Sequence, residues 1–385
     1  MYTPSTSLVK STGKTSPVGE LMSELLQLLN ILPESFSSRI PSDSLDCLVE
    51  FVLDLGRPFE VRYTDGNEIH EDLEVTHEIL EASMNYLGEF GQDNRAGINR
   101  TLHRISKIVA KDGKTVVGLT CRAGRPIPGS VDVLKDFLDT GKSILLLGKP
   151  GIGKTSKLRS IAEYLSDYRR VVIVDTSSEI AGEGHIPHSA IGRARRLQVP
   201  FNKSQEDIMI EAVENHTPEV IIIDEISTVP EAKAARTIAQ RGVQLIATAH
   251  GKTLSDFMQN PPLEELVGGI NAVTLTDENA KANNGRKTKL ERKTHPTFDV
   301  VVEIISYDEI HIHPDCTIAV DAILNPESEI PPTQQWRSVS GKQLYLNPHE
   351  RNDREDTPRK RTISNRHPRD SKEVNSKKLR GRKRY

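Results

Sequence analysis

A glycine-rich segment near the middle of the chain has the residue types that bind the phosphates of a nucleotide. Gly148-Lys-Pro-Gly-Ile-Gly-Lys-Thr155 fits the Walker A pattern G-x-x-x-x-G-K-[ST]. Its glycines let backbone N–H groups turn toward the phosphates, and its lysine reaches the β- and γ-phosphate oxygens. We therefore expect ATP and Mg²⁺ as cofactors, with Thr155 as a magnesium ligand. The expected nucleotide-binding residues are Gly148, Lys149, Pro150, Gly151, Ile152, Gly153, Lys154, Thr155 and Ser156.

The residues on either side of this segment match the structure that the pattern requires. An apolar run over Ser143–Leu147 precedes it, and a helix-forming segment over residues 156–165 follows it. A helix that begins at the loop directs its partially positive N-terminus toward the phosphates. The alternative is a glycine-rich turn that matches by chance, and such a turn would not need both flanks.

A second segment ends an apolar run with two carboxylates. Val220-Ile-Ile-Ile-Asp-Glu225 reads as a buried strand, so Asp224 and Glu225 lie at its carboxyl end, the Walker B position. Ligands of open α/β sheets bind at that edge. We expect Asp224 to hold Mg²⁺ directly or through water, and Glu225 to orient or deprotonate the attacking water. The alternative is an acidic strand end that faces solvent.

Two further strand ends carry candidates for the same chemistry. Val171-Val-Ile-Val-Asp-Thr-Ser-Ser-Glu179 places Glu179 after a strand, where some P-loop ATPases have their catalytic glutamate. Glu179 and Glu225 therefore compete for the role of base, and a structural role is the alternative for Glu179. Gln244-Leu-Ile-Ala-Thr-Ala-His250 ends another strand with Thr248 and His250, whose polar side chains are candidates to sense the γ-phosphate. For His250, a side chain without a catalytic role is an equal alternative.

Other charged and imidazole side chains give weaker indications. An arginine supplied across a subunit boundary can complete such a site, but spacing does not choose among five candidates, each otherwise a surface charge. His311 and His313 alternate along an expected strand, and with no third ligand in view a strand face is favoured over a metal site. The five arginines are Arg193, Arg195, Arg196, Arg236 and Arg241.

The elements that position these residues alternate between buried strands and amphipathic helices. This alternation predicts an α/β fold of the P-loop NTPase class with a mainly parallel sheet. The segments after it are closely spaced and predict antiparallel strands. The expected parallel strands are Ser143–Leu147, Val171–Asp175, Val220–Asp224, Gln244–Thr248 and Ala272–Leu275, and the expected antiparallel strands are Asp299–Ser306, Glu309–His313 and Thr317–Ala322.

An α+β domain is expected ahead of this region. Helical spacing of apolar residues predicts helices from Val18 to near Pro33, over Ser42–Leu55 and over Glu78–Phe90. Phe59–Tyr63 alternates like a strand, and residues 104–120 read as a hairpin. The expected organisation is a disordered segment over residues 1–16, the α+β domain over 17–125, the P-loop domain over 126–325, and a Pro- and charge-rich, basic, disordered tail over 326–385.

Composition limits the classes of protein to which the chain can belong. The longest apolar runs are far too short to cross a bilayer, so no integral membrane protein is expected. The N-terminus lacks the apolar core of a secretory signal and makes a poor transit peptide. The net charge of −3 combines a basic segment of +9 over residues 351–385 with −12 in the rest of the chain. This tail could attract the phosphates of a nucleic acid, although a merely solvating tail is favoured.

Several strings together resemble the conserved plastid and cyanobacterial "ycf" reading-frame family, which is related to the stage III sporulation ATPase. The resemblance spans roughly residues 20–325. The strings that carry it besides the P-loop are Thr101-Leu-His-Arg-Ile-Ser106, Gly118-Leu-Thr-Cys-Arg-Ala-Gly-Arg125, Asp175-Thr-Ser-Ser-Glu-Ile-Ala-Gly-Glu-Gly184 and Thr248-Ala-His-Gly251.

This resemblance implies an ATPase core like those of secretion motors and RecA- or AAA-like rings, with a homo-oligomer, plausibly a hexamer. It also implies the chloroplast stroma or the cyanobacterial cytoplasm, and it allows a peripheral membrane assembly. Longer cyanobacterial relatives look as though they end in a small single-strand nucleic-acid-binding domain with an Arg-x-x-x-His signature. Residues 351–385 depart from it, because Ile363 stands four residues before His367. We expect a ring-forming motor; the alternatives are an ATP-switched nucleic-acid-binding protein and a nucleotide-gated assembly protein with little turnover.

Overall fold

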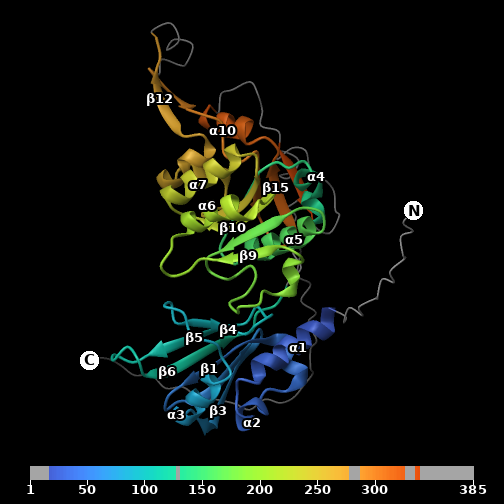
Figure 1. Ribbon diagram of the computed structural model, residues 1–385, viewed down its shortest axis with the longest axis vertical. Coiled ribbons are helices and arrows are strands. Elements are labelled where there is room, and N and C mark those ends of the chain that lie inside the picture. Colours follow the sequence, from blue (N-terminus) through green and yellow to red (C-terminus); the bar gives the residue numbers. More distant parts are fainter. Residues whose placement is uncertain (1–16, 127–130, 277–286, 326–333, 339–385) are drawn as a thin grey trace, which may run out of the picture. The chain divides into compact units, whose positions relative to one another are not determined.

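The computed structural model describes residues 17–126, 131–276, 287–325 and 334–338 (Figure 1). The expected disordered segment at residues 1–16 and the basic tail over residues 351–385 lie outside this part of the chain. Within it, no helix combines the length and the apolar composition that a membrane crossing requires.

The N-terminal part of the chain is an antiparallel sheet with helices packed on it. Its strands are β1 (Leu48–Asp54), β2 (Pro58–Tyr63), β3 (Gly66–Glu74), β4 (Arg95–Gly97), β5 (Arg104–Val109) and β6 (Val116–Arg122), in the order β3-β2-β1-β6-β5-β4. The helical segments before β4 are α1 (Pro17–Leu29), α2 (Glu34–Ser37), η1 (Ser42–Cys47) and α3 (His77–Met84). One apolar core joins side chains of α1, α2, α3 and the central strands. This is the α+β arrangement that the sequence predicts.

The prediction of a helix over Ser42–Leu55 is wrong. Only a short 3₁₀ helix forms, and the chain then continues as β1, which pairs with β2 on one side and β6 on the other. Phe51 and Leu53 are fully buried in this central position. A short apolar run fits either a helix or a strand by its spacing, and here the aromatic and β-branched residues Phe51 and Val52 favour the strand.

The second sheet has the topology of a P-loop NTPase. Its strands are β7 (Ile144–Gly148), β8 (Val171–Asp175), β9 (Arg195–Gln198), β10 (Val220–Ile226), β11 (Gln244–Ala249), β14 (Val300–Ile304), β15 (Glu309–His313) and β16 (Gln335–Ser338). They lie in the order β16-β15-β14-β7-β11-β10-β8-β9, and the strands from β14 to β9 are parallel. The predicted α/β fold with a mainly parallel sheet is therefore confirmed.

Helices cover both faces of this sheet (Figure 1). On one face lie α6 (Gln205–His216), α7 (Val229–Gln240), α8 (Leu254–Met258), η4 (Pro261–Val267) and α10 (Cys316–Leu324). On the other lie η2 (Asp132–Leu134), α4 (Lys135–Leu138), α5 (Lys154–Ser166) and η3 (Ser189–Ile191). Because β7, β8 and β11 are buried along their whole length, the polar groups at their carboxyl ends have fixed positions.

Three expectations about the end of this region are wrong. The strand expected at Ala272–Leu275 is β12 (Ile270–Thr274), which pairs antiparallel with β13 (Thr288–Arg292) in a separate sheet, since most of its residues are exposed. Thr317–Ala322 lies in α10 instead of a strand, because Asp315 caps the helix by accepting the Ile318 N–H. The sheet also extends past residue 326, because β16 pairs with β15.

Candidate functional site

The glycine-rich segment forms a loop between a buried strand and a helix N-terminus. β7 ends at Gly148, and α5 begins at Lys154. Gly151 and Gly153 have φ angles of +74° and +100°, a backbone conformation that side-chain-bearing residues rarely adopt. Lys154 Nζ donates to Gly148 O at 2.8 Å and so lies back over the loop. Burial lowers the pKa of Lys154, while the carboxylates of Glu225, Asp224 and Glu179 oppose that shift.

Asp224 is held in a buried position at the carboxyl end of β10. Its side chain accepts a hydrogen bond from Ser177 Oγ. Burial raises the pKa of Asp224 to about 7; the Ser177 hydrogen bond partly opposes this shift, and the nearby acids Asp175 and Glu179 add to it. A divalent cation beside this carboxylate would favour its charged form.

The oxygen groups around Asp224 fit a magnesium ion. Mg²⁺ takes oxygen ligands and keeps several waters, so it needs only one or two groups from the protein. The hydroxyl of Thr155 and the carboxylate of Asp224 are such groups, and both belong to the edge of the sheet where the P-loop lies. Several acidic groups repel one another here, which a bound cation would relieve.

Glu179 lies beside the P-loop and is held from two directions. Thr155 Oγ1 lies 3.5 Å from Glu179 Oε2, and Arg104 Nη2 donates to Glu179 Oε1 at 2.9 Å. The buried side chain of Arg159 holds the backbone of this segment, since it donates to Glu179 O at 2.7 Å and to Ile180 O at 2.8 Å. The side chain of Glu179 is 43% exposed, so it borders an open space beside Thr155.

Arg104 is a site residue that sequence reasoning missed. It lies on β5 of the N-terminal sheet, and besides Glu179 its guanidinium contacts Glu183 Oε1 at 3.8 Å. The signal that could have found it is its place in Thr101–Ser106, one of the strings that carry the family resemblance. Spacing along the chain gives no indication of the contact, because Arg104 lies on β5 of the N-terminal sheet and Glu179 lies in the segment that follows β8 of the P-loop sheet.

Glu225 and His250 form a pair at the ends of neighbouring strands. His250 Nε2 lies 2.9 Å from Glu225 Oε1, and the two side chains are 67% and 40% exposed. The register of β10 and β11 brings these strand ends together. Thr248 is different, because its buried hydroxyl donates to the backbone carbonyl of Asp224. Thr248 thus joins the two strands, whereas His250 faces open space.

Two cavities meet at Ser178 and Glu183, next to Glu179. A pocket of about 260 Å³ is lined by Thr155 and Glu179 together with the guanidinium-bearing side chains Arg104, Arg122, Arg125 and Arg159. This concentration of cationic groups next to the P-loop suits a polyphosphate. A larger cavity of about 590 Å³ shares Ser178 and Glu183 with it.

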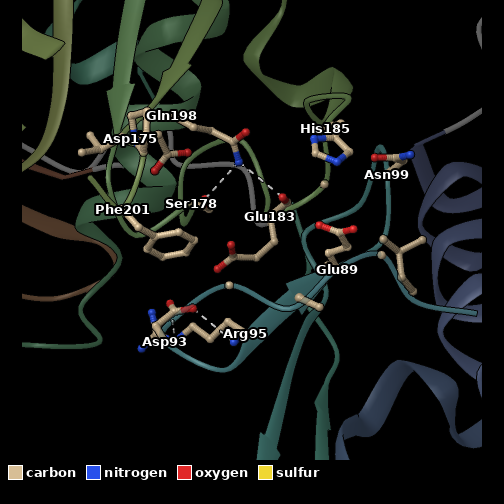
Figure 2. A pocket seen from close by; sticks show the side chains of 18 of the residues that line it. Glu89, Asp93, Arg95, Asn99, Asp175, Ser178, Glu183, His185, Gln198 and Phe201 are labelled. Atoms are coloured by element: carbon tan, nitrogen blue, oxygen red, sulfur yellow. Dashed lines mark hydrogen bonds and ion pairs between the residues drawn. The ribbon is translucent and has the colours of Figure 1, made fainter. Parts of the chain in front are cut away.

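The larger cavity is lined by both sheets of the chain. Figure 2 shows Gln198 directed toward Ser178 and Glu183; its Nε2 donates to Ser178 Oγ at 3.4 Å and to Glu183 O at 3.3 Å. Arg95 and Asp93 lie on another side, with 3.6 Å between Arg95 Nε and Asp93 Oδ2. The lining of the cavity is more acidic than basic, with Glu89, Asp93, Asp175 and Glu183 against Arg95, and it contains no P-loop residue.

None of the five arginines considered from the sequence lines the pocket that holds Thr155. Arg196 instead donates to the carbonyl oxygens of Gly182 and Gly184, which holds the loop after Glu179 in shape. Arg241, at the C-terminal end of α7, has its Nη2 3.7 Å from Oε1 of Glu214 on α6. Among the described residues, Arg104 is the arginine that pairs with the carboxylate of Glu179, while Arg159 binds the Glu179 backbone carbonyl.

The two histidines on β15 also differ from expectation. His311 and His313 were expected to form a strand face without a third metal-ligating residue. Glu303 on β14 lies beside both, 2.9 Å from His311 Nδ1 and 3.1 Å from His313 Nε2. The third residue was missed because it lies inside an apolar run on the neighbouring strand, Val300–Ile304.

Comparison with known proteins gives three kinds of match. The family model described as "Sporulation stage III, protein AA" matches residues 105–281. The chain is 49% identical over 328 residues to Protein SEEDLING PLASTID DEVELOPMENT 1 of Arabidopsis thaliana, covering 84% of this chain and 48% of that protein. It is 45% identical over 279 residues to the ycf45 protein of Cyanidium caldarium, covering 72% of this chain and 83% of that protein.

A solved structure also resembles the chain. The Legionella pneumophila ATPase DotB aligns with a TM-score of 0.44 and 14% sequence identity, over 76% of this chain and 77% of that one. The chain spans about half the length of the Arabidopsis protein.

Proposed function

The chain belongs to the ycf45 family, and from that premise we propose that it is an ATPase that binds and hydrolyses Mg·ATP at its P-loop. The plastid or cyanobacterial setting expected from the sequence agrees with the plastid relatives. The observation that carries the proposal is the convergence of Lys154, Thr155, Glu179 and Asp224 at one edge of the parallel sheet.

Each of these residues has a role in the proposed reaction. When ATP binds, the Lys154 ammonium group gives up its hydrogen bond to Gly148 O and neutralises the charge of the β- and γ-phosphate oxygens. Thr155 and Asp224 hold Mg²⁺, which when bound neutralises charge that develops on the phosphates. Glu179 orients and deprotonates the attacking water, since it lies beside Thr155 and reaches the open pocket. Glu225 and His250 sense the γ-phosphate from the neighbouring strand ends.

In this proposal, Arg104 has the role that was expected of an arginine supplied across a subunit boundary. Its guanidinium donates one hydrogen bond to the carboxylate of Glu179, and a γ-phosphate entering the pocket offers acceptor oxygens that a guanidinium binds in the same way. We propose that Arg104 exchanges Glu179 for the phosphate, which stabilises the transition-state charge and frees Glu179 to act as base. The N-terminal sheet would then control turnover.

A turnover assay on one variant tests the proposed activity. Purified parent chain should release phosphate from Mg·ATP, and Glu179→Gln should bind ATP as tightly as the parent while turnover falls on the order of 10²-fold. A folded parent that binds ATP without hydrolysis would support the nucleotide-gated assembly protein instead. A folded parent that binds no ATP would end the proposal.

Assembly into a ring, and work on a polymer or membrane-associated complex, is part of the same proposal. Light scattering of Glu179→Gln with Mg·ATP should give a mass near six chains, compared with a smaller species without nucleotide. Nucleic-acid binding is the alternative that would use the basic tail over residues 351–385, which lies outside the described part of the chain.

A further inference from the structure

Three buried side chains with metal-ligating atoms lie together on two neighbouring strands. Glu303 on β14 is paired in register with His311 on β15, and His313 lies two residues further along the same face. Glu303, His311 and His313 are 5%, 7% and 4% exposed. One ligand atom from each lies within 4.8 Å of the others. These residues take no part in the proposed ATP chemistry.

His311 presents one ring nitrogen to Glu303 and the other to Gln334. Its Nδ1 lies 2.9 Å from Glu303 Oε2, and its Nε2 lies 3.1 Å from Gln334 Oε1. A neutral imidazole that donates its Nε2–H to the Gln334 amide oxygen directs its Nδ1 lone pair at the Glu303 carboxylate. In that tautomer the two groups face each other as a pair of metal ligands.

His313 presents a second imidazole nitrogen to the same carboxylate. Its Nε2 lies 3.1 Å from Glu303 Oε1, and the rings of His311 and His313 are 4.5 Å apart between centroids. Two imidazole nitrogens and one carboxylate therefore face one another in a buried space, which is the donor set that holds a transition-metal ion.

We propose that Glu303, His311 and His313 bind a divalent transition-metal ion of the zinc class. Imidazole and carboxylate suit such an ion, and tetrahedral bonds of about 2.0–2.1 Å would separate ligand atoms by about 3.3 Å. The two separations that involve Glu303, 2.9 Å and 3.1 Å, need a small outward movement of the side chains, and all three ligand atoms already lie within 4.8 Å of one another. The fourth position is left to water.

Groups around the three ligands would orient them. Gln334 Oε1 accepts the remaining N–H of His311, and the ring of Trp336 stacks on His311 with centroids 4.4 Å apart. The backbone N–H of Leu254 donates to Glu303 Oε1 at 2.7 Å. Metal-ligating histidines and carboxylates characteristically have such hydrogen-bonded partners.

The position of the site indicates what the metal would do. Glu303 pairs in register with Leu147, the residue before Gly148, and it also binds the first residue of α8, which follows His250 along the chain. A metal ion would therefore join β15 to the strand beside the P-loop and to the segment after β11. The ion would stabilise the packing of β14, β15 and the start of α8 next to the P-loop, and it would take no part in ATP hydrolysis.

Metal content of the full chain, made without a polyhistidine tag, tests the proposal. After incubation with Zn²⁺ and exhaustive dialysis, the parent should retain one zinc per chain by mass spectrometry, and Co²⁺ in its place should give the visible absorption of a four-coordinate site. His311→Ala and His313→Ala should lower the retained zinc at least about tenfold. His295→Ala, which removes an exposed histidine elsewhere, should retain it.

Glu303→Gln keeps the size of the side chain and guards against loss of folding in the alanine variants. It should weaken zinc binding while circular dichroism still shows a folded chain. A folded parent that retains no zinc and gives no cobalt absorption would overturn the proposal, as would folded variants that retain zinc like the parent. All measurements are made without nucleotide, so they do not depend on ATPase activity.

Discussion

Arg104 Nη2 donates to Glu179 Oε1 at 2.9 Å, which connects β5 of the N-terminal sheet to the segment that follows β8 of the P-loop sheet. The same carboxylate has its second oxygen 3.5 Å from Thr155 Oγ1. Any movement of the N-terminal sheet against the P-loop sheet would change the surroundings of Glu179. The proposed control of hydrolysis by the N-terminal sheet rests on this contact.

Replacing Arg104 tests that control directly. Arg104→Ala should lower kcat on the order of 10³-fold, because an arginine on the transferred phosphate has an effect of this size. The Kd for ATP should change much less, since Lys154 and the loop backbone make the ground-state contacts. Steady-state phosphate release and calorimetric titration with ATP separate the two effects.

Arg39→Ala is the matched control for Arg104→Ala. Arg39 also forms an ion pair of the N-terminal part, with Asp72, and both of those side chains are largely exposed. Its removal should leave kcat unchanged within error. Equal losses in the two variants would mean that Arg104 acts through the stability of the N-terminal sheet and not on the phosphate.

Lys154→Ala should weaken ATP binding. Hydrogen bonds to charged groups contribute about 1.5–3 kcal/mol, so the Kd should rise on the order of 10–100-fold. Lys142→Ala is the control, since Lys142 is an exposed lysine just before β7. Titration with a fluorescent ATP analogue measures both. Tight binding by a folded Lys154→Ala variant would contradict the placement of the nucleotide at this loop.

Glu179 and Glu225 should differ in their effect on turnover. Glu179→Gln removes the base beside Thr155 and should lower kcat on the order of 10²-fold or more. Glu225→Gln keeps a hydrogen bond to His250 available and should cost on the order of tenfold or less. Single-turnover phosphate release measures both rates. The reverse order of the two effects would assign the base to Glu225.

The candidate site residues at the carboxyl edge of the parallel sheet could be predicted from the sequence, because each lies at or near the end of a recognisable apolar strand. The glycine pattern before α5 and the carboxylates after β8 and β10 each follow an apolar strand, and parallel strands bring their carboxyl ends to one edge. The predicted resemblance to the plastid "ycf" family is likewise confirmed by the Cyanidium relative.

Contacts between elements far apart in the chain could not be predicted in this way. Arg104 of the N-terminal sheet contacts Glu179 in the segment after β8, and Glu303 meets His311 through the register of an antiparallel pair. Thr248 was expected at the γ-phosphate, but its hydroxyl is bound to the carbonyl of Asp224. In each case the partner of a side chain depends on tertiary packing, which local periodicity does not encode.

Asp224 should make the stability of the nucleotide-free chain depend on pH. Its pKa is raised from 3.8 to about 7 in the folded chain, chiefly by burial. Between these values the folded chain binds a proton that the unfolded chain has lost, so the free energy of unfolding falls as the pH rises from about 4 to about 7. The stability that protonated Asp224 contributes is fully present below pH 4 and lost above pH 7.

Asp224→Asn should remove this part of the pH dependence, because asparagine stays neutral throughout. The loss between pH 4 and pH 7 in the parent, relative to the variant, should reach at most about 4 kcal/mol. Urea unfolding without Mg²⁺ and nucleotide, repeated across this range, measures it. Asp43→Asn, at an exposed position, should follow the parent curve. Parallel curves for the parent and Asp224→Asn would show that Asp224 is already charged at pH 5, and saturating Mg²⁺ should shift the parent toward that behaviour.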